Sequence, residues 1–273
     1  MLTQEQLTMM AENVARIREN MAAAAREAGR DPADILLCAA CKTRTVEEVI
    51  ASTVLPIDLF GENHVQELVE KTDANAYCGK PGHFIGHLQT NKVKNLVGRV
   101  NLIQSVDSVR LAREISRLSV QRDVTTDILL EVNIGREENK SGVAPEELES
   151  LLGEIAGMPG IFVRGLMAIP PICDEKERLQ NYFSLMHQYF IDIKSKKSDN
   201  VAMDFLSMGM SSSALCMPAR PVGGKTCPLL YRVAGKKATA HCASIRRMQQ
   251  AATSCGVSHR QSAPASSSRS PMP

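Results

Sequence analysis

The chain has 273 residues, 44% of them hydrophobic and only 4% aromatic, with no tryptophan, so any large core must be aliphatic. No apolar run approaches the roughly 20 residues of a membrane span, and the acidic residues Glu5, Glu12 and Glu19 argue against a transit peptide. We therefore expect a soluble cytoplasmic protein without a membrane partner, with a mitochondrial location as the alternative.

The charge is distributed unevenly along the chain, although the net charge is only +2. Residues 1–212 carry 23 basic and 30 acidic residues, whereas residues 213–273 carry nine basic residues and no acidic one. This second segment has a single aromatic residue, Tyr231, and therefore offers no stacking platform for nucleic acid. We expect a folded domain over 1–212, a basic, poorly ordered tail over 213–273, and no nucleic-acid partner.

The first elements are a long helix and a buried strand. Thr3-Gln-Glu-Gln6 has the form of a capping box, and it opens a helical pattern that runs to about Gly29. The apolar run Ile35–Cys41 (ILLCAAC) then predicts a strand that is buried on both faces. This strand ends on Lys42, which is either a surface charge or a nucleophile.

The cysteines and histidines do not indicate a metal site. Cys38 and Cys41 have metal-ligand spacing, but residues three apart on a strand point to opposite faces. His83 and His87 lie in another strand-like run with no acidic third ligand nearby. We expect no bound metal.

After the first strand, helices and strands alternate to the end of the predicted domain. Six further strands are expected at 58–63, 83–88, 102–108, 126–134, 161–169 and 203–211. Helices are expected between them at 46–52, 65–74, 91–100, 108–122, 145–158 and about 174–196. Such alternation is typical of a parallel sheet, and no G-x-G-x-x-G follows the first strand to indicate a dinucleotide site.

Polar residues at the ends of many strands favour a TIM-type (β/α)8 barrel, because the active face of such a barrel is built from the carboxyl ends of its strands. In a barrel mouth the amine of Lys42 would be desolvated and free to attack a carbonyl, and the best-known stable aldehyde for this purpose is pyridoxal 5′-phosphate (PLP). The loop Ser207-Met-Gly-Met-Ser-Ser212 follows the seventh strand, and its glycine, hydroxyls and backbone N–H groups suit a phosphate.

Taken together, these features resemble the pyridoxal phosphate homeostasis proteins, which bind PLP in a barrel of the alanine racemase N-terminal type. The resemblance runs in order over about 200 residues. The matching stretches are CKT (41–43), FGENHVQE (60–67), HFIGHLQTNKVK (83–94), IQSVDS (103–108), EVNIGREENKSG (131–142), RGLMAI (164–169) and LSMGMSS (206–212).

The resemblance implies a set of cofactor-binding residues and no catalytic residue. Lys42 would form the internal aldimine with PLP. The remaining residues expected to line or approach the cofactor are Asn63, His87, Met167, Ser207, Gly209, Met210 and Ser211. Glu62, Gln89 and Asn91 are expected to shape the barrel mouth without touching the ring.

The chain departs from the family after Ser212, through a change of reading frame or through divergence. The family continues with an acidic residue, a helix and an eighth strand that carries an arginine toward the pyridine nitrogen. Nothing from Ser213 onward matches, although 227–235 (CPLLYRVAG) could form one strand with Arg232 as the nearest candidate. We therefore expect an atypical or missing eighth strand.

The family implies PLP binding and an effect on the supply of free PLP, without an established reaction. We expect a non-enzymatic, monomeric PLP carrier in intracellular PLP homeostasis, with PLP-dependent apoenzymes as recipients. The alternative is a weak PLP-dependent amino-acid racemase or lyase. A third interpretation is a barrel that has lost its ligand together with its eighth strand.

Overall fold

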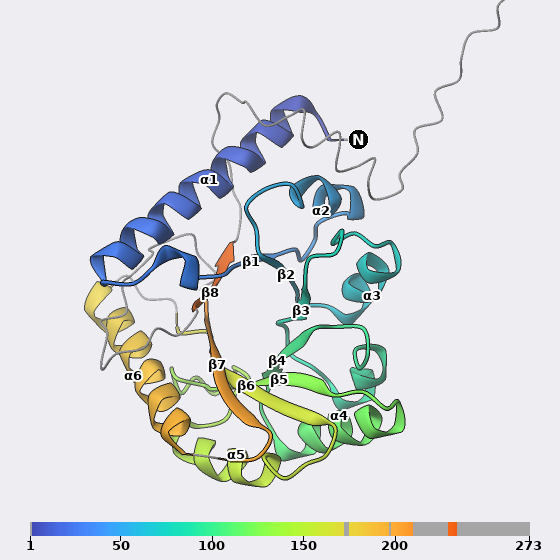
Figure 1. The fold of residues 1–273 in the computed structure, drawn as a ribbon, viewed down its shortest axis with the longest axis vertical. Helices are drawn as coiled ribbons and strands as arrows, with labels where there is room; N and C mark the ends of the chain where they lie inside the picture. Colours follow the sequence, from blue (N-terminus) through green and yellow to red (C-terminus); the bar gives the residue numbers. More distant parts are fainter. Residues whose placement is uncertain (1, 172–174, 197, 210–228, 234–273) are drawn as a thin grey trace, which may run out of the picture.

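The computed structural model describes residues 2–171, 175–196, 198–209 and 229–233. In these residues eight parallel strands form a closed barrel in chain order, and β8 pairs with β1 (Figure 1). The strands are β1 (Leu37–Ala40), β2 (Leu59–Glu62), β3 (Gly82–Phe84), β4 (Leu102–Val106), β5 (Thr126–Glu131), β6 (Ile161–Ala168), β7 (Val201–Met208) and β8 (Leu229–Val233). The barrel predicted from the alternating pattern is confirmed.

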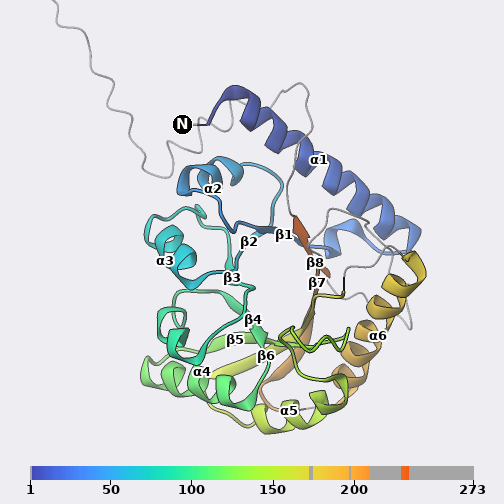
Figure 2. The ribbon, with the colours of Figure 1, turned by 180° about the vertical axis from the view of Figure 1, so that it is seen from behind.

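Helices surround the barrel on its outer side, as the views from front and back show (Figures 1 and 2). The α-helices are α1 (Gln4–Glu27), α2 (Val46–Ser52), α3 (Val65–Asp73), α4 (Val109–Gln121), α5 (Leu148–Ile155) and α6 (Lys176–Ser195). Short 3-10 helices are η1 (Pro32–Asp34), η2 (Thr90–Asn95) and η3 (Pro145–Glu147). None of the described helices combines the length and the apolar character that a membrane span requires.

Local sequence explains the first helix and one difference from expectation. The capping box at the start of α1 is confirmed, since the Thr3 side chain accepts from the Gln6 N–H and the Gln6 side chain accepts from the Thr3 N–H. The α-helix expected over 91–100 is instead the 3-10 helix η2. Val93 and Leu96 are both fully buried, and their spacing of three residues matches the 3-10 repeat.

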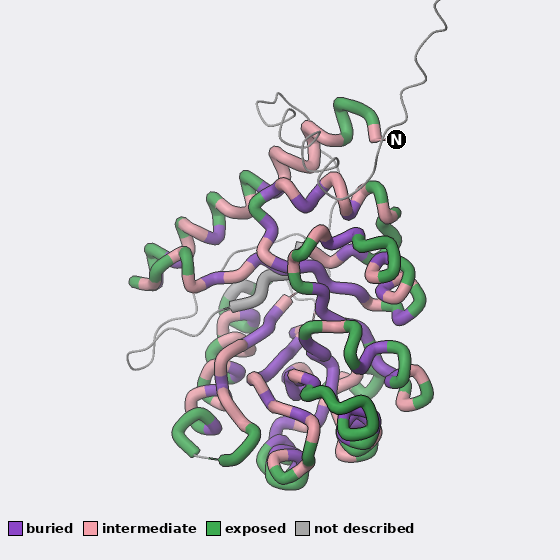
Figure 3. The backbone as a smooth tube through the Cα atoms, turned by 45° about the vertical axis from the view of Figure 1, so that its right-hand side comes forward, coloured by how far each residue is buried: buried purple, intermediate pink, exposed green. Residues whose placement is uncertain are grey.

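The strands separate an outer core, beneath the helices, from a small core inside the barrel. Figure 3 shows the buried stretches concentrated on the strands, with the exposed stretches on the surrounding helices. Along β1, Leu37 and Cys41 belong to the outer core, which also receives α1, whereas Cys38 packs inside with Leu129 and Met167. Cys38 and Cys41 therefore face opposite sides of the sheet, as their spacing predicts.

The eighth strand exists in an atypical form. β8 pairs with β1 through three residue pairs and with β7 through two, Leu206 with Leu229 and Ser207 with Leu230. It lies in the segment 227–235, in which we expected at most one strand. The eighth strand is therefore not missing, and the described strands close the barrel. The remainder of the expected tail, at 213–228 and 234–273, lies outside the described residues.

A close backbone contact joins the ends of β2 and β3. A Cβ atom added to Gly86 would lie 2.1 Å from the carbonyl oxygen of Asn63, a backbone atom that cannot swing away. Only glycine fits at this position, and its lack of a side chain allows the ends of β2 and β3 to lie this close together.

We predict that Gly86→Ala lowers the free energy of unfolding by about 1–3 kcal/mol, as overpacking of a tight site does. Gly153→Ala is the matched control, because a Cβ atom there meets nothing within 4 Å and the residue lies exposed in α5. The control should stabilise the protein by up to about 1 kcal/mol through helix propensity. Urea unfolding of both variants measures the difference, and equal stabilities would contradict the steric argument.

Candidate functional site

Lys42 lies at the carboxyl end of β1, in a turn. The Cys41 N–H extends the pairing with β2 by donating to the Gly61 carbonyl at 2.8 Å. The Arg44 N–H then donates back to the Cys41 carbonyl at 3.0 Å, which makes Lys42 and Thr43 the central residues of the turn. The Lys42 side chain is exposed. The expectation that the barrel mouth buries this amine is therefore not met in the structure, where β1 ends before Lys42 and the residue lies in an exposed turn.

Glu62 does not face the barrel mouth, contrary to expectation. It is fully buried on the outer side of β2, where its carboxylate pairs with the Nζ of Lys71 from α3 at 2.8 Å. Burial raises the pKa of Glu62 to about 7, although the Lys71 ammonium opposes this shift. Burial, together with the charge of Glu62, also raises the pKa of the Cys41 thiol well above its ordinary value, so this cysteine is not a thiolate nucleophile.

Asn63 and His87 follow β2 and β3 at the same end of the barrel as Lys42. Asn63 is half-buried, and His87 is exposed. The ring Nδ1 of His87 shares a hydrogen bond of 2.9 Å with the Ser141 hydroxyl, which belongs to the loop after β5. His87 thus connects the loops that follow β3 and β5.

The loop after β5 is organised by Asn133. Its side-chain Nδ2 donates to the Glu137 carbonyl at 2.8 Å, and its Oδ1 accepts from the Glu137 N–H at 3.1 Å. Gly142 lies against the backbone of Asn133 with φ +112°, where a Cβ atom would come within 2.5 Å of the Asn133 nitrogen. These contacts hold Ser141 in place beside His87.

Met167 and Ser207 lie on one level inside the barrel. The pairing register places Glu131 on β5 beside Met167 on β6, and Met167 beside Ser207 on β7. Met167 belongs to the interior core, and the three residues are nearly fully buried. The expected site residues from β6 and β7 therefore share a face with an acidic residue, Glu131, that the sequence did not single out.

A chain of hydrogen bonds crosses the barrel interior from Ser207. The Ser207 hydroxyl donates to Gln104 Oε1 at 2.6 Å, and Gln104 Nε2 lies 2.8 Å from Nδ1 of His83. Burial lowers the pKa of His83 to about 4, so its ring is neutral near pH 7. An amide nitrogen can only donate, which makes Nδ1 the acceptor and leaves the ring proton on Nε2.

The last expected residues lie at the end of β7. Gly209 follows β7 directly and is half-buried. Met210 and Ser211 lie outside the described residues. The structure thus brings Lys42, Asn63, His87, Met167, Ser207 and Gly209 to the interior or the carboxyl end of one barrel, and the clustering of the remaining two stays a prediction.

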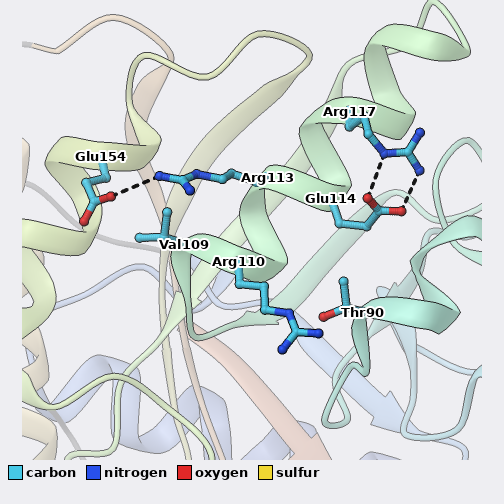
Figure 4. Close-up of a pocket in the computed structure, with 7 residues that line it drawn as sticks. All are labelled: Thr90, Val109, Arg110, Arg113, Glu114, Arg117 and Glu154. Carbon is cyan, nitrogen blue, oxygen red and sulfur yellow. Dashed lines mark hydrogen bonds and ion pairs between the residues drawn. The ribbon is translucent and has the colours of Figure 1, made fainter.

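Two cavities lie away from this end of the barrel interior. One of about 570 Å³ is lined by α4 and its neighbours, and two of its arginines pair with carboxylates, Arg113 with Glu154 and Arg117 with Glu114 (Figure 4). Another of about 440 Å³ lies on the outer side of β1, between α1 and α2. Among the described residues no cluster of His, Cys, Asp and Glu could hold a metal ion.

Solved structures show where this architecture recurs. An unknown protein from Bifidobacterium adolescentis has a TM-score of 0.76 and 29% identity, covering 85% of this chain and 96% of its own. PipY of Synechococcus elongatus PCC7942, solved with PLP bound, has a TM-score of 0.67 and 24% identity, covering 82% and 97%. An alanine racemase of Clostridium difficile 630, solved in complex with cycloserine, has a TM-score of 0.60 at 14% identity, and the match covers 81% of this chain but 58% of the racemase.

Sequence comparison gives the family directly. The family model of the alanine racemase N-terminal domain matches residues 13–222. The pyridoxal phosphate homeostasis protein of Aquifex aeolicus is 38% identical over 200 residues, which cover 73% of this chain and 87% of the relative. The protein of the same name from Escherichia coli K12 is 34% identical over 223 residues, covering 80% and 92%. The chain therefore belongs to the alanine racemase N-terminal domain family and, within it, to the pyridoxal phosphate homeostasis proteins.

Proposed function

We propose that this protein binds PLP covalently through Lys42 and acts as a PLP carrier in PLP homeostasis. The observation that carries the proposal is the exposed primary amine at the carboxyl end of β1, on a backbone that is hydrogen bonded to β2. Support comes from the names of the curated relatives, which are 31–38% identical, and from the PLP-bound structure of PipY. In the cell we propose a monomer in the cytoplasm, with PLP-dependent apoenzymes as recipients.

The residues near Lys42 fit such a ligand. Ala40 and Gly61 are partners in the pairing of β1 with β2, and the side chains of Ile85 and Cys38 pack against Gly61, where a Cβ atom would lie 2.7 Å from Ile85 Cδ1. The aldehyde of PLP forms a Schiff base with a primary amine. Asn63, His87 and Met167 would then lie around the ring, as the family resemblance implies.

Ser207 is proposed to support the site instead of donating to the phosphate. A serine hydroxyl has one proton, and that of Ser207 is donated to Gln104. We propose that the phosphate is bound by the backbone that follows, at Gly209 and at Met210 and Ser211, which lie outside the described residues. Backbone N–H groups at such a loop are suited to an anion.

The runner-up is a racemase or lyase, as the likeness to alanine racemase suggests. That chemistry needs a second proton-transfer group. In racemases built on this barrel, the group is a tyrosine from an additional domain. Of the tyrosines whose side chains are described, Tyr77 lies behind β2 next to Glu62, and Tyr182 and Tyr189 of α6 pack on the outer core. None of these three faces the barrel interior, which favours the carrier.

Glu131 also favours a site for an anionic ligand. Burial and, to a smaller extent, the nearby charge of Asp107 raise the pKa of this carboxyl to about 7. No hydrogen bond to its carboxyl oxygens is found among the described residues. A carboxyl group that keeps its proton near neutral pH repels a phosphate far less than a carboxylate does.

We predict that Lys42 carries PLP. Purified protein incubated with PLP and reduced with borohydride should show the pyridoxyl group on the peptide containing Lys42 by mass spectrometry. Lys42→Ala should abolish the adduct, whereas Lys94→Ala, which alters an exposed lysine of η2, should leave it intact. An adduct spread over other lysines, or retained in Lys42→Ala, would contradict the proposal.

We predict that Ser207→Ala weakens the binding of PLP and of unphosphorylated pyridoxal by the same factor. The substitution leaves Gln104 Oε1 buried without its donor, which should also cost about 1–3 kcal/mol of stability. Titration with both ligands, together with thermal unfolding, measures the two effects. A loss confined to PLP would show that the hydroxyl turns to the phosphate.

We predict that Glu131→Gln becomes stabilising as the pH rises. The native state binds the Glu131 carboxyl proton more tightly than the unfolded chain does, because the pKa of this carboxyl is about 7 in the native state and about 4.5 in the unfolded chain. The bound proton therefore contributes fully to folding stability below pH 4.5, and this contribution is lost as the pH rises through 7. Glu131→Gln has no carboxyl proton to lose. Its free energy of unfolding relative to that of the unaltered protein should therefore be roughly 3 kcal/mol higher at pH 8 than at pH 4.5.

Urea unfolding between pH 4.5 and 8 tests this pH dependence. Glu138→Gln, at an exposed position in the following loop, is the control and should show no such trend. A pH-independent difference between Glu131→Gln and the unaltered protein would mean that the folded and unfolded states bind the Glu131 proton equally tightly, which contradicts the prediction.

A further inference from the structure

The turn that carries Lys42 contains an unfavourable backbone conformation. Thr43 has φ +62°, in the left-handed region that β-branched residues rarely adopt. A residue in such a conformation costs on the order of 1–3 kcal/mol and persists only where its surroundings fix it. The contacts that fix Thr43 therefore also determine the direction of the neighbouring Lys42.

Two side chains from α3 hold the backbone on either side of Lys42. Before it, the Cys41 carbonyl accepts a hydrogen bond from the Nζ of Lys71 at 2.8 Å. After it, the Thr43 N–H donates to Oε2 of Glu67 at 2.9 Å. The same Oε2 lies 3.3 Å from the Lys71 Nζ, so one ion pair within α3 holds both ends of the Lys42 residue.

The environment of Lys71 indicates a positioning role. Its side chain is 2% exposed, and its three N–H donors have three acceptors, the Cys41 carbonyl, Glu62 and Glu67. A buried ion pair gains little net stability, because desolvation offsets most of the attraction between the charges. The pair does fix geometry, since each charge is confined by several directional hydrogen bonds.

The network is anchored behind β2. Glu62, fully buried, also lies 3.5 Å from the hydroxyl of Tyr77, and the ring of Tyr77 stacks on Phe60 of β2 at 5.6 Å between centroids. α3 and the sheet are thus joined by packing and by charge directly beneath the turn. A displacement of Glu67 or Lys71 would move the turn relative to the barrel.

We propose that Glu67 and Lys71 are positioning residues that orient Lys42 for attack on an aldehyde. This inference rests on the proposed function. In the step concerned, the Lys42 amine would form a bond to the aldehyde carbon of PLP, and the aldehyde oxygen would leave as water with the two amine protons. The network acts through the backbone and does not touch the reacting atoms.

Glu67 is the better position for a test. Lys71→Met would leave the Glu62 carboxylate buried without its partner and is expected to fold poorly. Glu67 has a side chain that is 27% exposed, so its replacement is tolerable. Glu67→Ala removes the acceptor of the Thr43 N–H, whereas Glu67→Gln keeps an oxygen in place for it. Glu70→Ala, exposed on the same helix, is the matched control.

The experiment measures two quantities in the full chain. Stopped-flow absorbance with excess PLP gives the rate of Schiff-base formation, which should fall about tenfold or more in Glu67→Ala, as misplacement of a reacting group does. Glu67→Gln should restore most of the rate, and Glu70→Ala should not change it. Hydrogen exchange of the peptide spanning residues 41–45, without ligand, should become faster only in Glu67→Ala.

The outcomes separate this inference from the proposed function. If the unaltered protein forms its adduct on Lys42 and Glu67→Ala forms it equally fast, the positioning role is wrong and the proposed function stands. If the rates of Glu67→Ala and Glu67→Gln fall together while residues 41–45 exchange as before, charge and not positioning is responsible, which also overturns the inference. If the unaltered protein forms no adduct on Lys42, both proposals fail.

Discussion

The pairing of β1 on both of its edges is the constraint on which the rest of the site depends. β1 is hydrogen bonded to β2 on one side and to β8 on the other, with Cys38 opposite Leu59 and Arg232. This register decides that Cys38 faces inward and Cys41 outward. It also fixes the point at which the strand stops, so the next residue, Lys42, begins at the end of the barrel where the loops gather.

The two faces of the sheet carry different polar groups near the Lys42 turn and at the level of Ser207. The outer face carries the ionic pair of Glu62 and Lys71, which lies beneath the turn and is shielded from solvent by α3. The inner face carries Ser207, Gln104 and a neutral His83, joined by hydrogen bonds. The sheet therefore separates the ion pair that holds the turn from the hydrogen-bonded chain of Ser207, Gln104 and His83.

The sequence allowed the seven strands and the position of Lys42 to be predicted, because strands buried on both faces read as continuous apolar runs between turn signals. Because these strands are apolar on both faces, their sequence does not indicate which residues face the barrel interior and which face the helices. Glu62 and Gln104 each interrupt an apolar strand, and without an alternating pattern nothing indicates that the first points outward and the second inward. The importance of Lys71 had a weak signal, its spacing of four residues from Glu67 on a predicted helix. The exposure of Lys42 depends on the turn geometry at Thr43, which no propensity predicts for a threonine.

A carrier and an enzyme make different demands on this arrangement, and the proposed carrier role needs the fewer groups. Covalent capture of an aldehyde requires an accessible amine held in one direction, which the exposed Lys42 and its anchored neighbours Cys41 and Thr43 provide. Catalysis on an amino acid would further require a proton acceptor aimed at the substrate. The inward-facing histidine, His83, is engaged with Gln104 and is 6% exposed, too deep in the barrel to serve as such an acceptor. Under the proposed function, the interior would support a ligand bound at its mouth, with Ser207, Gln104 and His83 holding one another in place.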